Sequence, residues 1–201
     1  MLAVDWGPVA AWAGTGATVC IAIVTALVAL GYLSPTRRPR LGVTYEPTEP
    51  WVRHNDIGGG VLWVRVGVEN HGPPRTAPAR GCVGRITAVR TNGAVRHDVD
   101  AVQLRWASVP GLRAFDPMDI RNGQREFLDV VAVRDGRMWH IITFDEPDWH
   151  PGYVLDLPMD DRHELDVVVF SDNAATVSAR LVLDAAVGDP VMAGSSTGDV
   201  A

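Results

Sequence analysis

The chain has 201 residues, of which about 150 remain for a globular part once an apolar N-terminal stretch and a polar tail are set aside, the usual size of one domain. All 18 basic residues are arginine, and residues 41–201 contain 15 Arg against 23 Asp and Glu, a formal net charge of −8. Such an acidic domain repels nucleic acid and anionic lipid headgroups, and no basic stripe with interleaved aromatics argues for a nucleic-acid-binding protein.

The first element along the chain is an uncharged stretch from Val9 to Leu33. It has 25 residues, whereas about 20 suffice to cross the hydrocarbon core of a bilayer. Trp6 and Tyr32 lie near its two ends, where interfacial aromatics are expected. A cleaved secretory signal is the alternative, but Asp5 is the only charged residue before the stretch, and no Ala-x-Ala cleavage site follows it. The sequence therefore predicts one transmembrane helix.

The segment after this span predicts its orientation. Residues 34–40 contain Arg37, Arg38 and Arg40, whereas residues 1–8 contain no basic residue. Positively charged flanks remain in the cytoplasm. We therefore expect a single-pass protein of the cell membrane, with a short N-terminal segment outside and the domain after the linker in the cytoplasm.

Small residues recur at four-residue spacing within the span, a pattern that lets helices approach closely and self-associate. An alanine-rich stretch also yields such pairs by composition alone, and we favour this explanation over self-association. The pairs are Ala10/Gly14, Ala13/Ala17 and Ala22/Ala26.

Beyond residue 40 the chain alternates short runs of β-branched and aromatic residues with clusters of Gly, Pro, Asn and Asp, which predicts strands joined by turns. Asn92-Gly93 and Asp135-Gly136 are two-residue hairpin signals. The expected strands are Leu41–Tyr45, Val61–Glu69, Cys82–Thr91, Val102–Trp106, Glu126–Arg134, Met138–Phe144, Tyr153–Leu157, Glu164–Ser171 and Thr176–Ala185.

This pattern predicts a mainly β domain over residues 41–187. In Val61–Glu69, alternate residues are apolar, as in a strand with one buried face. About nine strands with turns of this kind indicate an immunoglobulin-like two-sheet sandwich, with a barrel as the alternative. Residues 188–201 have no pattern that could bury apolar surface, so we expect a disordered tail.

The stretch from Val64 to Ala77 reads VRVGVENHGPPRTA and resembles a strand-and-turn motif of bacterial immunoglobulin-like adhesion modules. Leu165–Val169, followed by Asp172–Ala174 and the last strand, is similar to the closing hairpin of such sandwiches. The chain also resembles uncharacterised single-span bacterial proteins that carry this type of domain. The resemblance implies a β-sandwich, and because these modules usually face outside the cell, it supplies an exported surface adhesin as an alternative function.

One acidic loop is the strongest candidate for a metal or catalytic site. It contains Asp145, Glu146, Asp148 and His150, and carboxylates at such spacing can converge on a hard cation or supply a general base. The loop lacks the regularly alternating ligands and the glycine of a calcium-binding loop, so we favour the interpretation that it is a solvated turn. The charged cluster Asp160–Glu164 fits a polar connection with surface ion pairs.

The histidines and cysteines have structural explanations, whereas the tryptophans leave two roles open. No pair of histidines has the spacing of zinc ligands. Cys82 has no neighbour in sequence that would lower its pKa, so a buried core position is expected, and it cannot sensibly pair with Cys20 inside the apolar stretch. Five tryptophans could form a carbohydrate platform or fill the core, and the sequence leaves both open. These are Trp51, Trp63, Trp106, Trp139 and Trp149.

The sequence thus predicts a membrane-tethered, non-catalytic module that binds or scaffolds a protein partner, without cofactor, metal or nucleic acid. The reasons are the anchor, the rigid β scaffold and the lack of a reactive motif. The two alternatives are a metal-dependent enzyme built on the acidic loops and the exported adhesin.

Overall fold

The computed structural model describes residues 19–26, 38–55, 60–73, 76–97, 101–134, 136–142, 154–186 and 191–197. The chain divides into two compact units, residues 1–37 and 38–201. In the first unit, residues 19–26 are helical and exposed. Among the described residues no helix has both the length and the apolar character needed to cross a membrane. The rest of the predicted span lies outside the described residues.

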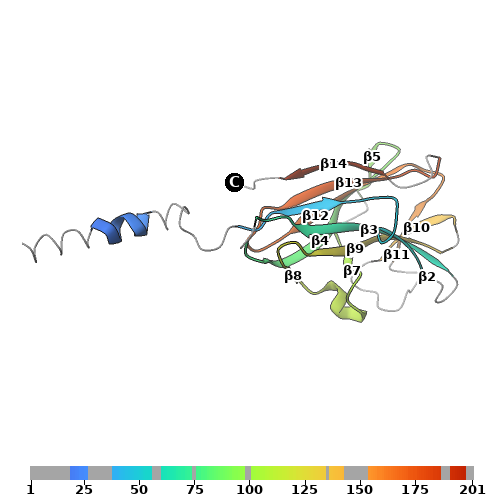
Figure 1. Ribbon diagram of the computed structural model, residues 1–201. Coiled ribbons are helices and arrows are strands. Elements are labelled where there is room, and N and C mark those ends of the chain that lie inside the picture. The colour runs from blue at the N-terminus through green and yellow to red at the C-terminus, as the bar shows by residue number, and fades with distance from the viewer. Residues whose placement is uncertain are drawn as a thin grey trace, which may run out of the picture. The chain divides into compact units, whose positions relative to one another are not determined.

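The second unit is a mainly β sandwich of two antiparallel sheets, each with seven strands (Figure 1). In sheet 1 the order is β1-β3-β9-β10-β11, with β2 beside β3 and β7 beside β9. Its strands are β1 (Leu41–Thr44), β2 (Val52–Asn55), β3 (Val61–Asn70), β7 (Arg105–Trp106), β9 (Arg125–Val133), β10 (Met138–Ile142) and β11 (Val154–Pro158).

Sheet 2 has the order β14-β13-β12-β4-β5, and β6 and β8 also pair with β4. A 3₁₀ helix, η1 (Gly111–Phe115), connects β7 to β8. The strands of sheet 2 are β4 (Ala79–Thr91), β5 (Ala94–Val95), β6 (Val102–Gln103), β8 (Met118–Ile120), β12 (His163–Phe170), β13 (Val177–Leu183) and β14 (Val191–Thr197). The predicted mainly β, two-sheet sandwich is confirmed, and the arrangement is consistent with an immunoglobulin-like fold.

The core lies between the inner faces of the two sheets. In β3, Val64, Val66 and Val68 are completely buried, as the alternating pattern predicts. Leu165 and Val167 of β12 approach them from sheet 2 and are equally buried. Each such side chain contributes roughly 1.5 to 3 kcal/mol relative to an exposed one. All residues of this core belong to the second unit.

All nine predicted segments contain strands, but the expected number was wrong because the described chain also forms β2, β5, β8 and β14. The segment Val102–Trp106 is divided between the sheets. Val102 pairs with Ile86 of sheet 2 and Trp106 with Leu128 of sheet 1, while the amide of Leu104 between them donates to the carbonyl of Gly84 at 2.9 Å. Three of the additional strands are very short, and short strands carry too few residues to show a period.

The predicted disordered tail is wrong for residues 191–197, which form the edge strand β14. Val191 is opposite Val182 and Thr197 is opposite Val177 of β13. Edge pairing relies on backbone N–H and C=O groups, which a sequence without an apolar period also supplies. The hydrophobic pattern therefore could not reveal this strand.

The turn between β4 and β5 confirms a predicted hairpin. Thr91 pairs with Ala94, and the two residues between them, Asn92 and Gly93, have φ angles of 49° and 83°. Positive φ at both central positions is typical of a type I′ turn, for which Asn-Gly is the favoured pair. In the second predicted hairpin signal, Gly136 has a φ of 69°, and Asp135 lies outside the described residues.

The side chain of Asn70 holds four backbone groups at one end of the sandwich. Its Oδ1 accepts the amides of Arg40 at 3.2 Å and Gly72 at 3.3 Å, and its Nδ2 donates to the carbonyls of Ala77 and Ile120, each at 3.2 Å. The residue is completely buried. An amide can accept two hydrogen bonds and donate two, so this group is fully satisfied.

We expect Asn70→Asp to destabilise the domain by about 3 kcal/mol or more, because two carbonyls, that of Ile120 buried, lose their donor and face a buried carboxylate instead. Asn122→Asp is the matched control, since the exposed Asn122 donates only to the carbonyl of Pro73, and its loss should stay within about 1 kcal/mol. Urea unfolding of residues 38–201 measures both. Equal losses in the two variants would contradict the role assigned to Asn70.

Candidate functional site

The outer face of sheet 1 carries a cluster of three charges, of which two are buried and the third, Arg105, is half-buried. Arg65 on β3 and Arg105 on β7 are both opposite Asp129 on the central strand β9. Arg65 Nε donates to Asp129 Oδ1 at 2.6 Å, and Arg105 Nε lies 3.2 Å from Asp129 Oδ2. These side chains point away from the core because Val64 and Val66, on either side of Arg65, point into it. We name this cluster the buried triad.

Burial governs the electrostatics of the triad. Asp129 is 5% exposed. Desolvation raises the pKa of its carboxyl, and this effect exceeds the opposing influence of Arg65, Arg105 and Arg53. A buried carboxylate of this kind persists only while its partners remain, because removing one partner leaves an uncompensated buried charge. The triad therefore fixes the positions of both arginines.

An exposed surface adjoins the buried triad. The guanidinium of Arg105 lies over the ring of Trp63 at 5.4 Å from the ring centroid, a cation–π contact. Trp63 is half-buried on β3, and the exposed Arg53 is opposite it on β2. We name Arg53, Trp63 and Arg105 the Arg–Trp surface. Asp129 holds Arg105 from the other side, so this surface is ordered by contacts within the domain.

A second aromatic group lies further along the same face. Trp51 is 5% exposed and contacts Phe127 edge to face, with 5.6 Å between the ring centroids. Arg125 lies over Trp51 at 5.2 Å and also forms an ion pair with Glu69 at 2.6 Å. Trp51 packs over Gly67, where an added Cβ would lie 3.2 Å from its Nε1. This side of the domain thus carries a layer of aromatic and charged side chains.

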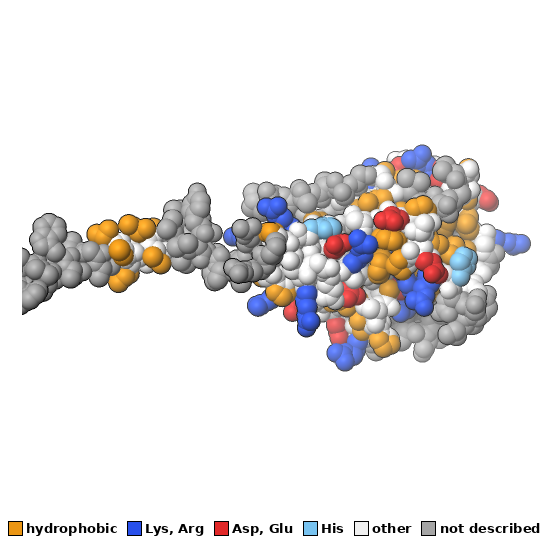
Figure 2. All heavy atoms as spheres, in the orientation of Figure 1, with side chains coloured by type: hydrophobic (Ala, Val, Ile, Leu, Met, Phe, Trp, Pro, Cys, Tyr) orange, Lys and Arg blue, Asp and Glu red, His pale blue; other side chains and the backbone are white. Residues whose placement is uncertain are grey.

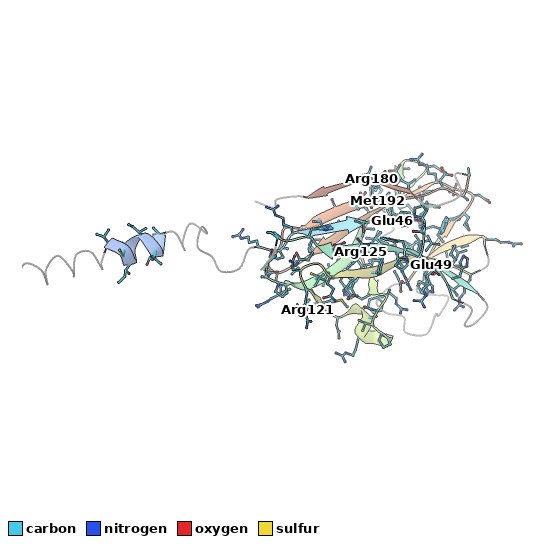
Figure 3. All side chains as sticks on the ribbon, in the orientation of Figure 1. Glu46, Glu49, Arg121, Arg125, Arg180 and Met192 are labelled. Carbon is cyan, nitrogen blue, oxygen red and sulfur yellow. The ribbon has the colours of Figure 1, made fainter. Side chains whose placement is uncertain are left out.

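Two figures show the surroundings of this layer. Hydrophobic side chains gather near the middle of the visible side of the domain, with acidic and basic side chains around them (Figure 2). Arg125 lies on the same side as Glu46 and Glu49, which belong to the loop that leads to Trp51 (Figure 3). The layer thus presents both signs of charge around apolar surface.

Sheet 2 carries a similar triad in a more exposed place. Arg90 Nη1 donates to Asp166 Oδ2 at 2.7 Å, and Arg180 Nε donates to Asp166 Oδ1 at 2.8 Å, across β4, β12 and β13. Partial burial acts to raise the pKa of Asp166, but Arg180 and Arg90 outweigh it and lower that pKa. The side chain of Asp166 is 22% exposed, so water shares in its solvation.

The predicted acidic site is not described by the structure, because Asp145, Glu146, Asp148 and His150 lie outside the described residues. Residues 160–162 of the second acidic cluster connect β11 to β12 as expected, whereas His163 and Glu164 already belong to β12. Asp161 accepts a hydrogen bond from Asn92 at 2.8 Å, and Arg162 and Glu164 form an ion pair at 3.4 Å. The described residues contain no group of three or more metal-ligating side chains that could hold an ion.

Two histidines have defined structural partners. His140 Nδ1 lies 2.7 Å from Asp156 Oδ1 on the outer face of sheet 1. His163 is completely buried, with Nε2 2.8 Å from the carbonyl of Pro158 and Nδ1 3.0 Å from Thr91 Oγ1. Because a carbonyl can only accept, His163 Nε2 carries a proton and donates. Both residues hold neighbouring segments together.

Cys82 lies where it was expected, and the tryptophans are divided between the core and an outer face. Cys82 is a buried core residue, and desolvation raises the pKa of its thiol to about 11, which disfavours the reactive thiolate. Trp106 and Trp139 also belong to the core. Trp51 and Trp63 instead lie on the outer face of sheet 1, and Trp149 is outside the described residues.

One feature of the sequence does point to the buried triad, namely two charged residues within strongly apolar strands. Asp129 stands inside the strand REFLDVVAV, and Arg65 inside VLWVRVGVEN. A charge within a strongly apolar strand is rarely buried unless it is paired, so Arg65 and Asp129 are candidates for an ion pair with each other. Arg105 could not be found in this way, because its position depends on the unexpected crossing of the chain between the sheets.

We expect Arg65→Met to destabilise the domain by about 3 kcal/mol or more at neutral pH, because the buried Asp129 carboxylate loses its nearest partner. Arg180→Met removes the equivalent Nε donor from the half-exposed Asp166 and should cost clearly less. Urea unfolding of both variants measures the difference. Loss of Arg65 raises the pKa of Asp129 further, so the penalty should shrink as the pH falls and the carboxyl is protonated. A penalty that does not change with pH would contradict the triad.

Comparison of the chain with protein-family models, with curated proteins and with solved structures found no match in any of the three.

Proposed function

We propose that the chain is a single-pass membrane protein whose β-sandwich is a non-catalytic module that binds a protein partner in the cytoplasm. The uncharged stretch from Val9 to Leu33 supports the anchor. Arg37, Arg38 and Arg40, which follow that stretch, support the cytoplasmic side. The partner is recognised by the outer face of sheet 1.

The observation that carries the proposal is the ordered Arg–Trp surface. Tryptophan and arginine are the residues that most often dominate the binding energy of protein interfaces. Arg105 lies between Asp129 and Trp63, which limits its rotamers, so a partner has less side-chain entropy to remove on binding. Arg53 adds an exposed guanidinium for a carboxylate of the partner.

Binding fits this surface better than catalysis. The charged atoms of the buried triad face one another, because the guanidiniums of Arg65 and Arg105 both point at Asp129. Arg105 also covers the ring of Trp63. Charged groups that pair with each other in this way hold neighbouring side chains in position and are not free to react with a substrate.

The first test concerns the anchor. We expect the full chain to remain in the membrane fraction after high-salt and carbonate washing, because 25 uncharged residues are long enough to span the bilayer. Residues 38–201 alone should be soluble. Immunoblotting of the two fractions measures this. Release of the full chain by carbonate would contradict the anchor.

The second test concerns the Arg–Trp surface. We expect Arg53→Glu with Trp63→Ala to reduce capture of the partner about tenfold or more when the full chain is cross-linked in its native membrane and purified. Quantitative mass spectrometry of the captured proteins measures the reduction. The thermal unfolding of each variant is measured in parallel to show that the domain remains folded.

Sheet 2 offers a matched control for this test. Arg85→Glu with Phe170→Ala changes one exposed arginine and one exposed aromatic on the outer face of the other sheet. Capture by this variant should be unchanged. If the sheet 2 variant loses the partner and the sheet 1 variant keeps it, the binding face has been assigned to the wrong sheet.

A further inference from the structure

The hydrogen bonds of Asn70 bring several arginines to one end of the sandwich. The backbone amide of Arg40 donates to Asn70 Oδ1, and the carbonyl of Arg40 accepts from the amide of His71 at 2.8 Å. Asn70 Nδ2 donates to the carbonyl of Ile120, the residue before Arg121. Arg40 and Arg121 therefore lie on either side of one buried amide.

Two more arginines belong to the same end. Arg80 follows Ala79, which is opposite Ile120 in the pairing of β4 with β8. Arg38 precedes Arg40 at the start of the second unit. Figure 3 shows Arg121 at the end of the sandwich where β1 begins. We name Arg38, Arg40, Arg80 and Arg121 the basic end, and all four residues are exposed.

The guanidiniums of the basic end lack ion-pair partners among the described residues, whereas the arginines on the outer faces of the two sheets are mostly paired. Two carboxylates lie nearby, but Asp119 Oδ1 accepts the amide of Gly81 at 3.0 Å, and Asp172 also lies against Gly81. Four arginines against two aspartates leave this end positive on a domain whose net charge is negative.

We infer that the basic end docks on anionic phospholipid headgroups of the membrane that anchors the chain. This inference rests on the proposed function, because it needs the anchor. Arg38 is covalently linked to the predicted span through residues 34–37, which reach at most about 15 Å when fully extended. The four guanidiniums are thereby held close to the headgroups, where arginine is attracted to the negative surface potential.

The negative net charge of the domain favours this orientation. Salt screens the electric field of each charge beyond about 8 Å at physiological ionic strength. The headgroups therefore interact with the nearest charged residues and not with the total charge of the domain. The acidic remainder of the domain is repelled while the basic end is attracted, and the two effects together turn the domain end-on. β4 runs from this end to the Asn92-Gly93 hairpin, and its 13 residues span roughly 40 Å.

Fluorescence resonance energy transfer from a dye on the Asn92-Gly93 hairpin to dyes on the membrane tests the inference in the full chain. A donor dye is attached at Val95→Cys, a residue 47% exposed on β5, in a Cys20→Ser background. Cys82 stays unlabelled because it is buried and its thiol has a pKa of about 11. The acceptor dye is placed on the headgroups of vesicles that contain phosphatidylcholine alone or phosphatidylcholine with phosphatidylglycerol.

We expect phosphatidylglycerol to roughly halve the transfer efficiency, because end-on docking keeps the hairpin on the order of 40 Å from the headgroups. High salt should restore the transfer. Replacing the four arginines of the basic end by glutamine should abolish the response to phosphatidylglycerol. A control with the same change in net charge replaces Arg85, Arg113, Arg137 and Arg162, which are exposed elsewhere, and should respond like the native chain.

The outcomes separate the inference from the proposed function. If the chain floats with both kinds of vesicle but phosphatidylglycerol leaves the transfer unchanged, the docking is wrong and the anchor stands. If the control variant loses the response as well, net charge and not the basic end is responsible, which also overturns the docking. If the chain floats with neither kind of vesicle, both the anchor and the docking are wrong.

Discussion

The buried amide of Asn70 is the contact on which one end of this domain depends. Four backbone groups, two from the turn after Asn70 and one each from the distant residues Arg40 and Ile120, point at this one side chain. The Asn70 side chain is completely buried, so its own polar atoms need these backbone partners. A single polar residue thereby sets where the chain enters the domain and where β8 meets β4. The grouping of exposed arginines there follows from this constraint.

Much of the fold could be predicted from the sequence because it rests on local patterns. The apolar alternation in Val64, Val66 and Val68 and the Asn92-Gly93 turn both depend on residues that are neighbours in the chain. The contacts that pattern reading misses depend on residues far apart. Arg105 meets Asp129 only because the chain changes sheets beside Leu104, and β14 is recognised only by its pairing with β13.

The candidate site, like the fold, was predictable from the sequence only in part. The sequence drew attention to Trp63 without placing it in the core or on a face, and it drew attention to the acidic loop from Asp145 to His150, which the structure does not describe. Neither the composition nor the net charge of −8 revealed how the charges are distributed. The same acidic domain contains a buried Arg65–Asp129 pair on sheet 1, a more exposed arginine pair on sheet 2 and a positive end. Net charge is therefore a poor guide to what each surface attracts.

The crossing between β6 and β7 also links the two sheets mechanically. Within five residues, Val102 is hydrogen-bonded into sheet 2 and Trp106 into sheet 1, and the side chain of Leu104 between them is buried in the core. Sliding or separating the sheets must therefore break pairing on both sides of this crossing at once. A pulling force applied through the N-terminal linker is shared between the two layers, which favours rupture of the whole sandwich in one cooperative step over peeling of one sheet from the other.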